Sequence, residues 1–89
     1  MRVGPVLEAN DTGRAVAQAI VELETNADVN DRGAYLRVLS PDRCVLSRAI
    51  VERLLRRPFR LPGDLELVMV SFSGKLRIDE DSAIWEAGP

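Results

Sequence analysis

The chain has 89 residues, of which 46% are hydrophobic and 29% charged, a composition typical of one small folded domain. Twelve basic and fourteen acidic residues leave a net charge of −2, which gives no electrostatic reason to expect nucleic-acid binding. Histidine is absent and Cys44 is the single cysteine. These counts exclude an internal disulfide and every histidine-based catalytic or metal site, and a lone thiol is typical of the reducing cytoplasm. No apolar run is long enough to span a membrane.

The N-terminal part of the chain predicts a strand followed by a helix. Residues 3–9 alternate weakly between apolar and polar, with Gly4-Pro5 typical of the start of a strand or of an edge strand. Residues 10–12 offer side chains that cap a helix, and apolar residues then recur at one-sided helical spacing as far as Leu23.

A loop and a hairpin are expected next. Residues 26–32 are polar and predict a loop. Residues 34–39 predict a strand, and residues 40–43 a turn with proline at its second position. We therefore expect residues 44–46 to return antiparallel to residues 34–39 as the second arm of that hairpin.

The following segment predicts a second helix and a buried strand. Ser47 is placed to cap the helix, and Pro58 should end it near Arg57 because the residue before proline disfavours helical geometry. After a turn at Pro62-Gly63, residues 65–72 are strongly strand-like. Their apolar run Val68-Met69-Val70 indicates a strand that is covered on both faces.

Two short strands at residues 76–78 and 83–85, joined by a turn at residues 79–82, complete the expected fold. The predicted order is β-α-β-β-α-β-β-β. Helices alternate with hairpins, so we predict a single α+β domain over residues 1–89, with two helices and a mixed or antiparallel sheet.

The stretch SFSGKLRIDED, residues 71–81, contains two motifs that resemble ligand sites. Gly74-Lys75 matches only the end of a phosphate loop, and a strand pattern follows it instead of the required helix. The simpler interpretation is that Gly74 allows a bend with positive φ between two strands. The acids at residues 79–81 would alternate between opposite faces if extended, so a solvated turn is favoured over a cation site.

Two further features are candidates for function. Cys44 lies within a strand pattern and is expected to be a buried structural thiol. Basic residues gather around the end of the second helix, where they would complement the negative end of the helix dipole or meet an acidic partner. We call these residues the arginine patch: Arg53, Arg56, Arg57 and Arg60.

Three segments, in this order, resemble a known family: VGPVLEANDTGRAVAQAI, DRGAYLRVLSPDRCVLSRAIVERLLRRPF and DLELVMVSFSGKLRIDEDSAIWE. They are similar to the effector proteins, also called coupling or regulatory proteins, of soluble bacterial multicomponent diiron monooxygenases, in detail to the toluene and phenol monooxygenase type. The resemblance covers nearly the whole chain. It rests on an ordered set of motifs, namely Gly4-Pro5, Ala34-Tyr35 with Arg37, Arg57-Pro58-Phe59, and Ser71 to Gly74 with the acidic turn.

The resemblance implies a cytoplasmic protein without a cofactor, a metal site or catalytic residues of its own. Such effectors bind a separate hydroxylase that holds two irons, while a reductase, in some systems with a ferredoxin, supplies electrons. The effector couples oxygen activation and electron use to substrate hydroxylation or epoxidation by selecting one hydroxylase conformation. Neither nucleic acid nor membrane is expected as a partner.

The resemblance also implies which residues meet the hydroxylase: Ser71, Phe72, Ser73 and Gly74. The arginine patch is a second candidate for that interface. The alternative for this segment is that Phe72 belongs to the core and the serines are solvated. A function of another class also stays open, a small regulatory ligand-binding α+β domain, which a metabolite would stabilise without any effect on a hydroxylase.

Overall fold

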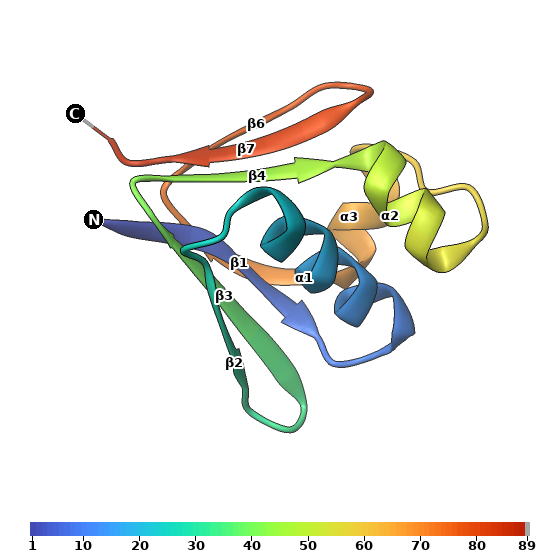
Figure 1. The fold of residues 1–89 in the computed structure, drawn as a ribbon, viewed down its shortest axis with the longest axis horizontal. Helices are drawn as coiled ribbons and strands as arrows, with labels where there is room; N and C mark the ends of the chain where they lie inside the picture. Colours follow the sequence, from blue (N-terminus) through green and yellow to red (C-terminus); the bar gives the residue numbers. More distant parts are fainter. Residues whose placement is uncertain (89) are drawn as a thin grey trace.

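Two antiparallel sheets are built from seven strands, and the computed structural model describes residues 1–88 of the chain (Figure 1). The four-stranded sheet has the order β2-β3-β1-β5 and the three-stranded sheet the order β4-β7-β6. The strands are β1 Arg2–Glu8, β2 Asp28–Asp31, β3 Tyr35–Pro41, β4 Arg43–Ser47, β5 Met69–Ser73, β6 Lys75–Ile78 and β7 Ser82–Glu86. The helices are α1 Asp11–Leu23, α2 Arg48–Leu55 and α3 Gly63–Val68.

The predicted α+β class, its two main helices and the order of its elements are confirmed, and the structure adds two short elements to them. Strand β2 forms in the segment expected to be a loop, where all four of its residues are exposed at the edge of the sheet. An edge strand with no buried side chain leaves no apolar alternation in the sequence.

Helix α3 replaces the first half of the strand predicted for residues 65–72. Leu65 and Val68 are buried three positions apart, whereas Leu67 between them is 80% exposed. This spacing is helical, but α3 has little more than one turn. In so short an apolar segment the sequence pattern of a helix cannot be told from that of a strand.

The hairpin expected across residues 34–46 is wrong. Strand β3 pairs with β1 and β2, whereas β4 pairs with β7 in the other sheet. Asp42, with φ of 60°, forms the corner between the sheets. Its N–H donates to the Met1 carbonyl at 2.7 Å and its carbonyl accepts from Ala87 N–H at 2.9 Å. Backbone hydrogen bonds to Met1 and Ala87 therefore fix the conformation of the chain at Asp42, without any pairing of β3 with β4.

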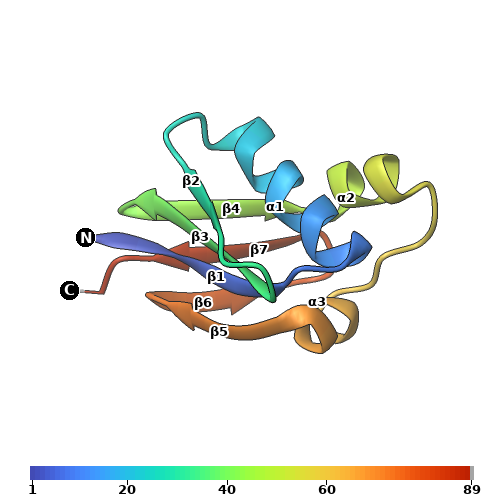
Figure 2. The same cartoon turned by 90° about the horizontal axis from the view of Figure 1, so that it is seen from below.

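Helix α1 packs beside β1 and β4, as Figures 1 and 2 both show. Asn10 caps it by accepting a hydrogen bond from Gly13 N–H at 2.8 Å. Its stripe of Val16, Ala19 and Ile20 is fully buried in the core. None of the helices formed by residues 1–88 is long and apolar enough to cross a membrane.

Strand β5 is not covered on both faces, contrary to the expectation from its apolar run. It is the outer strand of its sheet, because the chain passes to the other sheet after Gly74 (Figure 2). Leu7 pairs with Met69 and Val6 with Ser71, so Val70 is an extra residue in a β-bulge. Val70 is 63% exposed to solvent.

Candidate protein-interaction site

The segment from Ser71 to Gly74 lies at the exposed edge of the four-stranded sheet. Ser71 and Phe72 are exposed and Ser73 is half-buried. Phe72 pairs with Pro5, whereas the two serines pair with Val6 and Gly4. Side chains alternate along a strand, so Phe72 and the serines point to opposite faces of the sheet. A partner that contacts the whole segment must therefore straddle the edge of β5.

Gly74 forms the bend that carries the chain from one sheet to the other. Its φ is 99°, as expected for the predicted bend between two strands. A Cβ at this position would lie 2.7 Å from Val3 Cγ1 and 2.8 Å from the Glu86 carbonyl oxygen. Both the conformation and the close approach therefore require glycine, and Gly74 sets the position of the serines before it.

Three exposed apolar side chains follow one another along α3 and β5. They are Leu67, Val70 and Phe72, and we call them the apolar strip. Phe72 is 44% exposed, so the alternative interpretation of this residue as core is wrong. The family resemblance implies Phe72 as an interface residue, whereas the apolar run at residues 68–70 predicts a strand covered on both faces. The exposure of Val70 and Phe72 follows from the edge position of β5.

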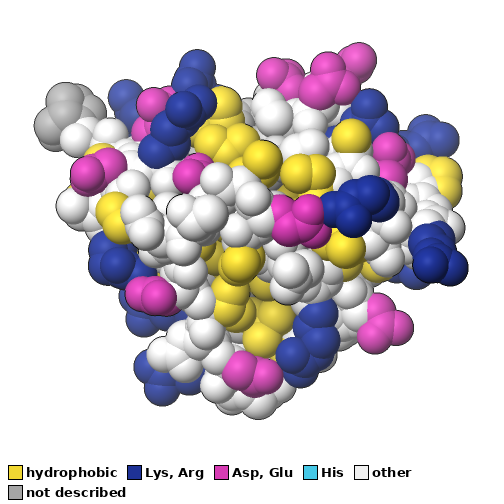
Figure 3. Space-filling model, in the orientation of Figure 1, with side chains coloured by type: hydrophobic (Ala, Val, Ile, Leu, Met, Phe, Trp, Pro, Cys, Tyr) yellow, Lys and Arg dark blue, Asp and Glu magenta, His cyan; other side chains and the backbone are white. Residues whose placement is uncertain are grey.

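The arginine patch surrounds the loop after α2, and basic side chains gather at the right of Figure 3 over this region. Arg53 forms an ion pair with Glu22, and Arg57 donates to Thr12 Oγ1 at 2.7 Å. Arg56 ends α2 in a left-handed conformation with φ of 58°. Among residues 1–88, only Arg53 of this patch is in an ion pair.

A surface hollow joins the arginine patch to the apolar strip. Arg57 and Leu67 both line this hollow, which has a volume of about 260 Å³. Its wall also includes Pro58 and Phe59, and Asp64 adds a carboxylate. The arginine patch and the apolar strip are therefore linked through α3.

One face of the four-stranded sheet carries mainly polar and small side chains. The pairing register places Asn30, Arg37, Val6 and Ser71 side by side across the four strands. Tyr35 lies on the same face two residues before Arg37 and is 42% exposed. We call this surface the open face, with the residues Val6, Asn30, Tyr35, Arg37, Ser71 and Ser73. In the sequence Tyr35 and Arg37 belong only to the family pattern, because the register that aligns Arg37 with Ser71 is not visible in a sequence.

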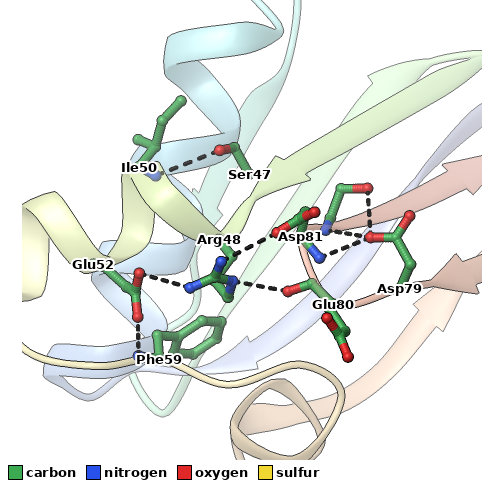
Figure 4. A network of polar contacts seen from close by, with 9 residues as sticks. Ser47, Arg48, Ile50, Glu52, Phe59, Asp79, Glu80 and Asp81 are labelled. Atoms are coloured by element: carbon green, nitrogen blue, oxygen red, sulfur yellow. Dashed lines mark hydrogen bonds and ion pairs between the residues drawn. The ribbon is translucent and has the colours of Figure 1, made fainter.

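The acidic turn between β6 and β7 is held by contacts within the chain (Figure 4). The Asp79 carboxylate accepts from the backbone N–H groups of Asp81 and Ser82, each at 2.8 Å. These N–H donors hold the pKa of Asp79 below its usual value. The turn expected at residues 79–82 is therefore confirmed, and its first carboxylate serves as its internal acceptor.

Arg48 connects this turn to α2 and to the loop that follows it. Its guanidinium donates to the Glu80 carbonyl at 2.8 Å and pairs with Asp81 at 3.1 Å and Glu52 at 2.9 Å (Figure 4). Glu52 in turn accepts from Phe59 N–H at 2.9 Å. Within residues 1–88, no group of three or more histidine, cysteine or acidic side chains is arranged to hold a metal ion.

Cys44 is buried, as predicted. Burial, with a smaller contribution from the charge of Glu24, raises the pKa of its thiol to about 12. The thiol is therefore neutral at physiological pH and is a poor nucleophile.

The fold and site define a small α+β module with an exposed sheet edge that carries apolar side chains. The chain belongs to the MmoB/DmpM family, whose model matches residues 1–86. It is 34% identical over 85 residues to the effector subunit of the alkene monooxygenase system of Xanthobacter autotrophicus (strain ATCC BAA-1158 / Py2). That alignment covers 93% of this chain and 83% of the relative.

Solved structures with the same fold include two chains from phenol hydroxylase–regulatory protein complexes. The first has a TM-score of 0.88 and 26% identity, covering 99% of this chain and 100% of its own. The second has a TM-score of 0.82 and 27% identity, covering 97% and 99%. The soluble methane monooxygenase regulatory protein B has a TM-score of 0.73 at 17% identity, and 98% of this chain covers 65% of it, a likeness of fold alone. The family resemblance inferred from the sequence is confirmed.

Proposed function

We propose that this chain is the effector subunit of a multicomponent monooxygenase and acts by binding the hydroxylase component of that system. The observation that carries the proposal is its end-to-end match, at a TM-score of 0.88, with a chain of a phenol hydroxylase–regulatory protein complex. The exposed edge of β5 supports it, because the apolar strip is left for a partner to cover.

The docking surface that we propose follows the chain from the arginine patch through α3 to the bend at Gly74. Apolar side chains would supply the interface centre and the arginines its charged rim, the usual arrangement of such interfaces. Ser71, Ser73 and Gly74 are small residues on either side of Phe72. Because they add little bulk to the surface, a partner backbone would be able to approach closely. The bulge at Val70 disfavours simple strand addition, so the contact is made through side chains.

The chain would act without chemistry of its own. The hydroxylase would hold the two irons, and a reductase, with or without a ferredoxin, would supply electrons in the cytoplasm. The effector would bind one hydroxylase conformation more tightly than the others and thereby time oxygen activation with substrate oxidation. A coupling free energy of about 1–3 kcal/mol would change the populations of these conformations about 5- to 150-fold.

Titration of the hydroxylase from the same source with the purified chain tests the proposal. Calorimetry or fluorescence anisotropy should show saturable binding, with a whole-number ratio of effector to hydroxylase active site. The Gly74→Ala variant is a useful comparison, because it moves the serines while retaining every charge of the surface. Absence of binding by the folded wild-type chain would refute the proposed function.

A further inference from the structure

Arg37 is at the centre of the open face and has no charged partner there. Its register neighbours are Asn30 on β2 and Val6 on β1, and Ser71 follows on β5. Leu36 and Val38 on either side of it are buried in the core, so the backbone of β3 fixes the direction of Arg37 away from the core. The guanidinium is therefore presented to solvent from a rigid element.

The acidic residues nearest to Arg37 in the sheet are engaged by other residues. Asp28 pairs with Arg2, and Glu8 accepts from Asn10 Nδ2 at 3.3 Å. Arg37 forms no ion pair with any of residues 1–88, whereas five other arginines do. These five are Arg2, Arg14, Arg48, Arg53 and Arg77. The open face thus carries an exposed cation that has no ion-pair partner among residues 1–88.

The proposed contact at Ser71 extends to Arg37 for geometric reasons. Adjacent strands lie about 4.8 Å apart, so two spacings separate the backbones of Arg37 and Ser71 by about 10 Å. A standard interface covers about 800 Å² of each partner, equivalent to a disc with a radius of about 16 Å. Helix α1 packs on the opposite side of β1 and β3, so a partner that straddles the edge of β5 can extend from Ser71 and Ser73 across the uncovered open face.

We propose that the hydroxylase covers the open face and places a carboxylate opposite Arg37, with Tyr35 packing beside that ion pair. This inference rests on the proposed function and adds a specific anchor to it. A guanidinium pairs with a carboxylate through two parallel hydrogen bonds, which fixes orientation as well as charge. Tyrosine and arginine are also the residue types that most often dominate binding energy at interfaces.

Charge reversal at Arg37 tests this proposal, with Arg43→Glu as the matched control. Arg43 is also exposed and forms no ion pair with any of residues 1–88, but it lies on β4 in the other sheet. Arg37→Glu should weaken binding to the hydroxylase about ten-fold or more, a typical loss at an interface anchor. Arg43→Glu changes the net charge by the same amount but lies far from the open face. Because salt screens such distant charges, it should change the dissociation constant less than about two-fold.

Arg37→Lys and Arg37→Gln separate geometry from charge. If a carboxylate receives the guanidinium through two hydrogen bonds, lysine at this position should restore only part of the affinity. Circular dichroism melting of every variant verifies that the fold is intact, and Arg37→Gln provides the test if Arg37→Glu fails to fold.

The outcomes distinguish this inference from the function on which it rests. Equal weakening by Arg37→Glu and Arg43→Glu would mean that only long-range charge matters and would overturn the anchor. Wild-type affinity of Arg37→Glu, combined with lost binding of a variant at Ser71, would overturn it while leaving the proposed function standing. No binding by the wild-type chain would overturn both.

Discussion

The carboxylate of Asp79 stabilises the turn between β6 and β7 by accepting two backbone N–H donors. Its pKa is lower in the folded protein than its usual value of about 4. Its contribution to stability is therefore present above about pH 4 and is lost as the pH falls through the lowered pKa.

We predict that Asp79→Ala lowers the melting temperature at pH 7 and that its difference from the wild type shrinks below about pH 4. Asp79→Asn retains an acceptor for the turn, so it should lose less stability and show little of this pH dependence. Thermal melts from pH 2 to pH 7 measure the effect. A difference that stays constant over this range would show that Asp79 has no altered pKa.

Gly74 permits a backbone conformation that other residues adopt only under strain. A methyl group there would meet Val3 and the Glu86 carbonyl oxygen at less than 3 Å. We predict that Gly74→Ala destabilises the fold by about 1–3 kcal/mol, measured by urea unfolding.

Gly63→Ala is the control for this substitution, because a Cβ at Gly63 would have no atom within 4 Å. It should leave stability unchanged or raise it by up to about 1 kcal/mol through the reduced entropy of the unfolded chain. Equal effects of the two substitutions would refute the special role of Gly74.

Strand β5 is the element on which the proposed docking surface depends. We predict that Ser71→Trp leaves the melting temperature nearly unchanged, because this side chain is exposed, and weakens hydroxylase binding. Overpacking of an interface typically costs about 1–3 kcal/mol, or about 5- to 150-fold in affinity. Thr25→Trp, an exposed position between α1 and β2, should bind like the wild type. Unaltered affinity of Ser71→Trp would remove β5 from the interface.

Element boundaries set by local chemistry could be predicted from the sequence. Asn10 and Ser47 do cap α1 and α2, with Ser47 Oγ accepting from Ile50 N–H at 3.4 Å. Pro58 likewise predicted the end of α2 to within a few residues. These features depend on neighbours within one helical turn, which the sequence displays directly.

Pairing between distant segments could not be predicted in the same way. Residues 34–39 and 44–46 are close in sequence and separated by a turn motif, yet they belong to different sheets because Asp42 redirects the chain. The same limit applies to the candidate site. The family resemblance predicts Ser71 as an interface residue, whereas its alignment with Arg37 depends on the register of the three strands β3, β1 and β5.

At the scale of the whole molecule, the chain has a net charge of −2, and the arginine patch is a local basic region at the right of Figure 3. If the arginine patch contacts an acidic hydroxylase surface, affinity should fall as ionic strength rises, because salt screens exposed charges. Anisotropy at 0.05 and 0.5 M salt measures this slope. A variant with glutamine at Arg56, Arg57 and Arg60 should have a shallower slope, and an identical slope would assign these arginines to solvent.

Coupling efficiency is the most direct test of the central claim that this chain acts only through a hydroxylase. The reconstituted hydroxylase and reductase should form more product per reducing equivalent as the chain is added, with a plateau once the hydroxylase is saturated. The chain alone, or with the reductase alone, should form no product. A folded chain that leaves product yield and electron consumption unchanged at full occupancy of the hydroxylase would contradict the account.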